Sequence, residues 1–521
     1  MSRAHTPDHC DQPIDQSAAR GDLFNNNVAS PAHGQPDDAA RISLRGVTYN
    51  YPRPVWERNA GTLVEHLHDI NLDIEPGQVV LLCGASGSGK STLLRAMNGL
   101  VPLFYEGELS GTVTVGGTNL AEVELHDMGH ISSTVFQNPR TQFFTSTVKS
   151  EMAFTRENYG DEPHAILQAM EKAARDTGIE KFLDRQLDAL SGGELQRVAC
   201  ACALCADVAV LLFDEPTSNL SPQGIENFRD LLKNLKQRGY TIVIAEHRIH
   251  FLKGLIDTVY RLEGGKIVEH ISGEDFFALN NTQRLERGLR ALTVPEIALP
   301  EPSGEGLCIK NLRFGYGSAP VLDIENLIFP EGAVTILAGE NGAGKTTLAM
   351  LICGLLEANS EATFQFDGKN MSPRRRNRTC GMVMQDVRRQ LFSESVEAEV
   401  TLGLSKEDAA KVDVDALLNT MELQEFCQRH PISLSGGQQQ RLVIASTLAA
   451  HKRVVIFDEP TSGVDLRHLH RIACELKKLA AAGAVVIVVT HDPELIAECG
   501  EYMYVLEKLE KEGLGRTREL A

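Results

Sequence analysis

A glycine-rich loop that ends in Lys and Ser or Thr occurs twice in this 521-residue chain, each time after a short apolar run. The two copies match the pattern G-x-x-x-x-G-K-[ST], and they read Gly84-Ala85-Ser86-Gly87-Ser88-Gly89-Lys90-Ser91-Thr92 and Gly339-Glu340-Asn341-Gly342-Ala343-Gly344-Lys345-Thr346-Thr347. The preceding run reads as a buried strand and the following residues as a helix. In that context the glycines let backbone N–H groups and the helix N-terminus point at phosphate oxygens. A plain glycine turn would give no reason for Lys to follow, so we predict that both loops bind nucleotide phosphate.

Two apolar runs end in a pair of acids, Asp214-Glu215 and Asp458-Glu459. A buried strand has no structural use for adjacent carboxylates, because desolvation penalises both unless a cation or a substrate compensates. We predict that Asp214 and Asp458 support Mg²⁺ together with the hydroxyls of Ser91 and Thr346. We predict that Glu215 and Glu459 polarise the attacking water.

The chain from about residue 41 is an internal repeat, and this decides the architecture. Lys345 follows Lys90 by 255 positions, whereas Ser435, Asp458 and His491 each follow their counterparts Ser191, Asp214 and His247 by 244. A duplicated domain explains this shared register. Strands that alternate with helices predict a mainly parallel sheet in each half. The predicted divisions are a disordered extension at 1–40, a first domain at 41–280, a linker at 281–306 and a second domain at 307–515.

The net charge of the chain limits the kinds of partner that it can bind. The net charge of −19 argues against general binding of nucleic acid and against direct adhesion to an anionic membrane surface. No apolar run approaches the roughly 18 residues of a membrane span, and the polar N-terminus lacks the apolar segment of a signal peptide. We therefore expect a cytosolic chain whose eleven cysteines are reduced.

Two side-chain clusters leave alternatives open. Cys200, Cys202 and Cys205 could bind a metal, but their small-residue surroundings favour buried helix positions. The basic run 374–378 could contact nucleic acid or lipid headgroups, but we predict a solvated loop there.

The octets 190–197 and 434–441, LSGGELQR and LSGGQQQR, resemble the signature of ABC ATPases. The resemblance covers roughly residues 41 to 515. It implies two P-loop NTPase (ABC ATPase) domains in tandem, of α/β class, each with a mainly parallel sheet core, an N-terminal antiparallel β part and a helical subdomain. It also places Gln137 and Gln385 beside Mg²⁺ and the attacking water, His247 and His491 as switch histidines, and Tyr51 and Tyr316 against adenine.

The resemblance further implies an ATPase in which the two halves close head to tail around two ATP molecules. Site one would join Lys90, Ser91, Gln137, Asp214, Glu215 and His247 to the signature residues Ser435, Gly436 and Gly437. Site two would join Lys345, Thr346, Gln385, Asp458, Glu459 and His491 to Ser191, Gly192 and Gly193. One departure stands out in the D-loops, which are residues 218–221 and 462–465: Ser221 occupies the position that is Asp465 in the second half. We nevertheless predict two competent sites.

The segment around Gln137, Phe136-Gln137-Asn138-Pro139 followed by Gln142-Phe143-Phe144, is similar to the pattern of energy-coupling factor (ECF) ATPases, as is Ala245-Glu246-His247-Arg248. That resemblance implies a transmembrane T-component and a separate S-component that selects a vitamin, a vitamin precursor or a transition metal ion. It places the chain on the cytoplasmic side of the cell membrane as a peripheral subunit. A fused sugar-importer ATPase, or a cytosolic tandem ABC protein that acts on ribosomes, remains the alternative.

Overall fold

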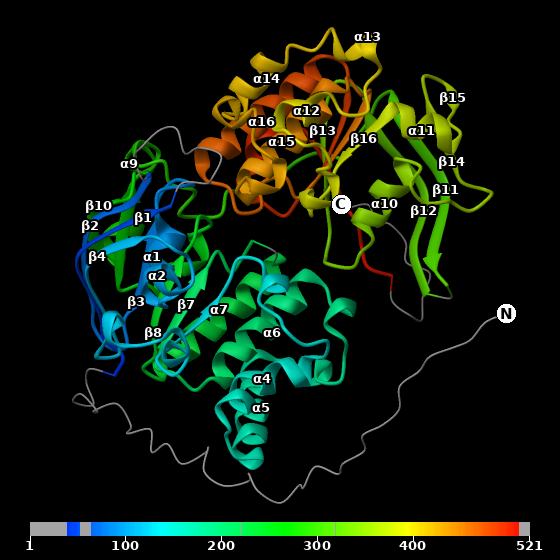
Figure 1. The fold of residues 1–521 in the computed structure, drawn as a ribbon. Coiled ribbons are helices and arrows are strands. Elements are labelled where there is room, and N and C mark those ends of the chain that lie inside the picture. Colours follow the sequence, from blue (N-terminus) through cyan, green and yellow to red (C-terminus); the bar gives the residue numbers. More distant parts are fainter. Residues whose placement is uncertain (1–38, 53–63, 219, 318, 510–521) are drawn as a thin grey trace, which may run out of the picture.

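The computed structural model describes residues 39–52, 64–218, 220–317 and 319–509 of the chain. It shows two halves of similar architecture, each with one four-stranded sheet and one larger sheet. In Figure 1 the first half runs from blue to green and the second from yellow-green to red, with the antiparallel sheets on opposite outer sides. The predicted extension at 1–40 lies almost entirely outside the described residues.

The first half contains an antiparallel sheet and a mainly parallel sheet. The antiparallel sheet has the order β2 (Val64–Ile74), β1 (Ile42–Tyr51), β4 (Glu108–Val115) and β5 (Thr118–Asn119). The second sheet has the order β10 (Lys266–Ser272), β9 (Thr258–Glu263), β3 (Val79–Cys83), β8 (Thr241–Ala245), β7 (Val210–Asp214) and β6 (Ser132–Val135). Only the β9–β10 pair of this sheet is antiparallel.

The second half repeats this plan with a fully parallel core sheet. Its antiparallel sheet has the order β12 (Ala319–Pro330), β11 (Gly306–Tyr316), β14 (Thr363–Phe366) and β15 (Lys369–Asn370). Its parallel sheet has the order β16 (Cys380–Val383), β17 (Val454–Asp458), β18 (Val485–Val489), β13 (Val334–Ala338) and β19 (Tyr502–Val505). The predicted fold class is thereby confirmed.

The continuous apolar runs of the core strands follow from burial on both faces. Along β3, Leu81 packs into one core cluster and Leu82 into the cluster on the opposite face, because successive side chains point to opposite sides. Each parallel sheet is therefore a buried platform. The carboxyl ends of its central strands, β3 with β7 and β13 with β17, carry the predicted site residues.

Helices cover these sheets and also form a separate helical layer in the first half, where α4, α5 and α6 share a core of their own. The helices of the first half are α1 (Lys90–Met97), α2 (Leu100–Leu103), α3 (Leu125–Met128), α4 (Val148–Tyr159), α5 (Pro163–Thr177), α6 (Gly192–Cys205), α7 (Pro222–Gln237), α8 (Gly273–Phe277) and α9 (Asn281–Glu286). Those of the second half are α10 (Lys345–Ile352), α11 (Pro373–Thr379), α12 (Val396–Thr401), α13 (Lys406–Ala409), α14 (Val414–Thr420), α15 (Gly436–Ala449), α16 (Leu466–Ala481) and α17 (Pro493–Cys499). Within the described ranges, no helix is both long and apolar enough to span a bilayer.

The segment that joins the halves is packed against both of them. Leu289 and Leu292 are buried in the core of the first half, whereas Leu299 packs against the core of the second. Between these anchors, Arg290 is only 3 % exposed and pairs with Asp492 and with a glutamate on α17. The connection is therefore a strap that is fixed at both ends.

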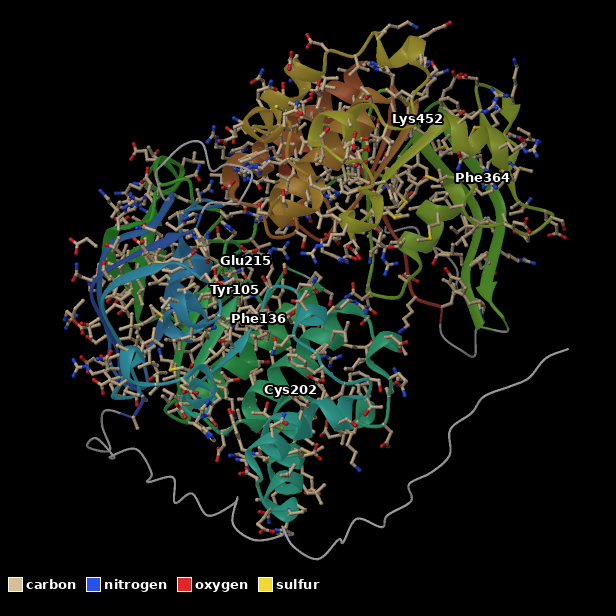
Figure 2. The ribbon with its side chains drawn as sticks, viewed as in Figure 1. Tyr105, Phe136, Cys202, Glu215, Phe364 and Lys452 are labelled. Atoms are coloured by element: carbon tan, nitrogen blue, oxygen red, sulfur yellow. The ribbon has the colours of Figure 1, made fainter. Side chains whose placement is uncertain are left out.

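The basic run 374–378 is not the predicted loop. It forms most of α11, with Ser372 as the N-cap and Pro373 at the first helical position. Arg376 is 2 % exposed, donates to Leu351 O and lies with its guanidinium 3.9 Å from the centre of the Phe364 ring. Figure 2 labels Phe364 on the adjoining sheet. The prediction was wrong about the loop and about Arg376, whose long stem can be buried because its guanidinium meets a carbonyl and an aromatic face. It was right about solvation for the rest of the run, since residues 374, 375, 377 and 378 are exposed.

Two of the three clustered cysteines take buried helix positions, as predicted, and Cys202 is half-buried on the same helix. Cys200 and Cys205 lie on α6 at 3 % and 0 % exposure, and burial raises the pKa of both thiols to about 12. Figure 2 shows Cys202 in the same helical layer. Protonated thiols of this kind pack as small apolar groups.

Candidate functional site

Each phosphate loop is a tight turn between a core strand and a helix. In the first, Gly84 and Gly89 have φ values of 142° and 103°, and a Cβ on Gly84 would lie 2.2 Å from Leu262 O. Only glycine fits such a backbone. Lys90, the first residue of α1, donates from Nζ to Gly84 O and Ala85 O at 3.0 Å each. Burial lowers the pKa of this ammonium group.

The second loop repeats this geometry. Lys345 donates from Nζ to Gly339 O at 2.5 Å and to Glu340 O at 2.9 Å. Burial lowers the pKa of Lys345 as well. In both halves the predicted lysine therefore folds back onto its own loop, where its ammonium group donates to two loop carbonyls.

The predicted hydroxyl and carboxylate ligands lie side by side in both halves. Ser91 Oγ donates to Asp214 Oδ1 at 2.9 Å, and Thr346 Oγ1 donates to Asp458 Oδ2 at 2.7 Å. Burial raises the pKa of both carboxyl groups, so a cation would offset an unfavourable desolvation. Adjacent hard oxygen donors fit Mg²⁺, which takes few protein ligands and completes its shell with water and phosphate oxygens.

The second acids occupy strained backbone at the strand ends. Glu215 and Glu459 have φ values of 46° and 51°, which non-glycine residues rarely adopt. Their N–H groups donate to Ala245 O and Val489 O at 2.8 Å, which fixes the bend. Figure 2 shows Glu215 on the side of the first half that faces the second. Both carboxylates are thus fixed beside the phosphate loops, directly after β7 and β17.

The glutamine and histidine of site one converge on Glu215. Gln137 Nε2 donates to Glu215 Oε2 at 2.6 Å, and His247 Nε2 lies 3.5 Å from Oε1 and 3.3 Å from Lys90 Nζ. Burial, followed by the charge of Lys90, lowers the pKa of His247 well below its usual value. Burial and Asp214 raise the pKa of Glu215 well above its own.

Site two is more open. Glu459 accepts from Thr490 Oγ1 at 3.2 Å, and burial raises its pKa to about 7. His491 is neutral, because burial and then the charges of Lys345 and Arg248 lower its pKa to about 4. Its Nε2 atom is buried and has no hydrogen-bond partner among the described residues.

A cavity of about 410 Å³ brings the predicted members of site two together across the boundary between the halves. One wall is Ser191, Gly192 and Gly193 at the start of α6 in the first half. The opposite wall belongs to the second half, and its predicted residues are Tyr316, Asn341, Gly342, Gly344, Lys345, Thr346, Thr347, Gln385, Asp458, Glu459 and His491. The Tyr316 hydroxyl lies 3.4 Å from Thr347 Oγ1 at the edge of this cavity.

Site one receives the D-loop of the second half. Ser86 N donates to Asp465 Oδ2 at 2.8 Å, and a Cβ on Gly463 would lie 2.7 Å from both Gln137 Nε2 and Glu215 Oε2. The contact of Ser435 with this site remains a prediction, because its described bonds only cap α15. The adenine contact of Tyr51 is also still a prediction.

Sequence reasoning gave no role in these sites to two arginines that lie near them. Arg248 lines the cavity of site two although it belongs to the first half, and Arg290 of the strap pairs with Asp492, the residue after His491. The repeat held a signal for the first: the position after the switch histidine is Arg248 in one half and Asp492 in the other. No local pattern marked Arg290.

The fold and these sites define a tandem P-loop ATPase. A family model described as ABC transporter matches residues 67–218 and 322–462. A protein of Treponema denticola, named provisionally as an ABC transporter ATP-binding protein, is 38% identical over 92% of this chain and 98% of its own length. A protein of Methanosarcina mazei with the same provisional name is 33% identical over 91% of this chain and 89% of its own.

The chain belongs to the ABC transporter family, and its two ABC domains bind ATP with Mg²⁺ and hydrolyse it. Among solved structures, a model of ribosome-bound archaeal Pelota and ABCE1 matches with a TM-score of 0.63, over 90% of this chain and 77% of that one. At 21% identity this likeness shows the fold alone.

Proposed function

We propose that this chain is the ATP-hydrolysing, energising subunit of a membrane importer, with ATP bound between its two halves. The cavity of site two carries the proposal, because a P-loop from one half faces a Ser-Gly-Gly segment from the other. Both segments present backbone N–H groups at a helix N-terminus, which is the arrangement that binds phosphate oxygens. A triphosphate there would bridge the halves.

We assign the following roles to the site residues. Glu215 and Glu459 hold and polarise the attacking water, while Gln137, Gln385 and the two switch histidines orient it toward the terminal phosphate. Bound Mg²⁺ would be held by Ser91 with Asp214 and by Thr346 with Asp458, and it would supply positive charge beside the phosphates. Donors surround the terminal phosphate only when the halves are closed, so hydrolysis weakens the link between them. Turning a 1:99 population into 99:1 takes about 5.5 kcal/mol of differential affinity, which two bridging triphosphates can supply.

A matched pair of exposed aromatic residues supports a membrane partner. Phe144 and Phe392 are 78% and 76% exposed and lie 248 positions apart, the same offset as Gln137 and Gln385. Their loops are held firmly, because the backbone N–H of each Phe donates to a glutamate that is itself buried. Large apolar side chains held out in solvent at two related positions are typical of a docking surface.

The partner chemistry follows from the ECF resemblance of the segment after Gln137. We infer a T-component that docks at both aromatic loops and an S-component that selects a vitamin, a vitamin precursor or a transition metal ion. The chain would then act as a peripheral subunit at the cytoplasmic face of the cell membrane.

Two measurements test this proposal. The wild-type chain should hydrolyse ATP, and E215Q and E459Q made separately should each lower turnover. If one change leaves the rate untouched while the other abolishes it, the two-site assignment is wrong.

In the host, the chain should co-purify with a small multi-span membrane protein. The double variant F144S with F392S should abolish that association, while L167S, at another exposed apolar position, keeps it. Co-purification with ribosomes and no membrane protein would overturn the transport role.

A further inference from the structure

Arg248 comes from the first half but lines the nucleotide cavity of the second site. It follows His247, a residue of site one, yet its side chain lies among the lining residues of site two together with Lys345, Glu459 and His491. Only 8% of Arg248 is exposed. A cation from the first half is therefore present where the phosphates of ATP would lie.

The guanidinium of Arg248 is only loosely paired. Among the described residues its one ionic partner is Asp492, at 3.8 Å between Nη2 and Oδ2, which is too long for a hydrogen bond. Asp492 does not need it: Arg290 donates to Oδ1 at 2.5 Å and Thr461 donates to Oδ2 at 2.6 Å. Arg248 can therefore leave Asp492 without stranding a buried carboxylate.

A nearly buried guanidinium without hydrogen bonds is costly unless an anion completes its surroundings. Its planar donors match a phosphate well, since two parallel N–H···O bonds can form. His491 lines the same cavity, and its buried Nε2 atom has no hydrogen-bond partner in the part of the chain that the structure describes. Two unsatisfied groups from opposite halves thus line one cavity.

We propose that Arg248 is a nucleotide-binding residue of site two, supplied by the first half, and that it contacts the terminal phosphate of ATP. The inference rests on the proposed binding of ATP at site two and deepens it. Site one receives no such cation from the equivalent position, because that position is Asp492, whose oxygens are occupied by Arg290 and Thr461. The two sites are therefore chemically unequal.

The test is equilibrium binding of AMP-PNP and of ADP, each with Mg²⁺, to the full chain. K90A disables the P-loop of site one and so reports on site two, whereas K345A reports on site one. In the K90A background, R248Q should weaken AMP-PNP binding about tenfold or more and leave ADP binding almost unchanged, because only the first ligand has the terminal phosphate. R248K should restore part of the affinity, and R175Q, at an exposed arginine on α5, should have no effect.

In the K345A background, R248Q should leave AMP-PNP binding unchanged. An equal loss for AMP-PNP and ADP in the K90A background, or a loss confined to site one, would overturn the assignment. Unchanged AMP-PNP affinity in both backgrounds would overturn it too. If the K90A chain with Arg248 intact binds neither nucleotide, the composite site two itself is wrong, which separates the two failures.

Discussion

Asp465 uses its two carboxylate oxygens for different tasks. Oδ1 accepts from His468 N and caps α16, while Oδ2 accepts from Ser86 N in the opposite half. Burial opposes ionisation here, but the hydrogen bonds from His468 and Ser86 outweigh it and lower the pKa of Asp465. Ser221, its counterpart, has a single side-chain oxygen, and that oxygen caps α7 by accepting from Gly224 N. The difference between Asp and Ser therefore removes one contact between the halves.

This contact predicts an effect that is specific to one site. With site two silenced by E459Q, D465S should lower ATP turnover at site one about three- to tenfold, because one hydrogen bond to the P-loop is lost. The reciprocal change S221D, tested with E215Q, should not lower turnover at site two. Steady-state phosphate release measures the turnover of both double variants. If D465S with E459Q and S221D with E215Q lose turnover equally, Asp465 has no effect specific to site one.

Asp492 predicts a pH dependence of stability. Burial alone would raise its pKa, but Arg290 and Arg248 outweigh burial and bring the pKa to about 2. Since its unfolded value is 3.8, the ionised carboxylate stabilises the fold above pH 3.8, and this contribution of about 2 kcal/mol is lost as the pH falls toward 2. The free energy of unfolding, measured with urea between pH 5 and about 3, should therefore change less with pH for D492N than for the wild type. If the free energy of unfolding changes equally with pH in both proteins, Asp492 is not the source of the pH dependence.

Among the elements, the strap between the halves depends on one buried arginine. Arg290 donates to Asp492 and to Glu494, and these carboxylates outweigh the effect of burial and raise its pKa. R290A leaves two acids near each other without their main cation and should cost about 3–5 kcal/mol. Arg287, which lies nearby and pairs with Glu269 at partly exposed positions, is the matched control, and R287A should cost less than about 1 kcal/mol. Thermal unfolding of both variants checks this, and similar shifts for the two would refute the strap.

Helix α11 supports the P-loop helix of the second half. Arg376 donates to Leu351 O, one of the last carbonyls of α10, which also accepts from Gly354 N at 3.1 Å. R376A should destabilise the second half by about 1–3 kcal/mol, because that carbonyl and the Phe364 face lose their contact. R375A, at an exposed position of the same helix, should have almost no effect in the same unfolding measurement.

The sequence predicted what short motifs encode and missed what packing between distant segments creates. The P-loops, the acids after β7 and β17 and the Ser-Gly-Gly segments have fixed local spacing, so their positions could be read from residues alone. The burial of Arg376 depends on Phe364 in a neighbouring sheet, and Arg248 reaches the second half only because the halves are in contact. Arg376 was predicted to be solvated and Arg248 was given no place in the second site. Because an arginine has a long stem and a fixed charge, the same local sequence allows its side chain to be exposed or buried.

For the whole molecule, the duplication places both halves of each composite site in one chain. The D-loops also meet directly, since Ser462 Oγ donates to Ser218 O at 2.5 Å across the boundary. The halves nevertheless differ at Asp465 and Ser221 and at Arg248 and Asp492, so the pseudo-symmetric assembly contains two unequal sites. ATP bound at the boundary would control how the halves close, and with them any docked membrane partner.

The most direct test asks which signature serves which P-loop. In an E215Q chain, where hydrolysis depends on site two, S191R should abolish ATP turnover because a bulky cation would block the wall opposite Lys345. S435R in the same chain should retain most of that turnover, with circular dichroism confirming that both variants fold. If S435R abolishes turnover and S191R does not, each P-loop works with the signature of its own half, and the head-to-tail account is contradicted.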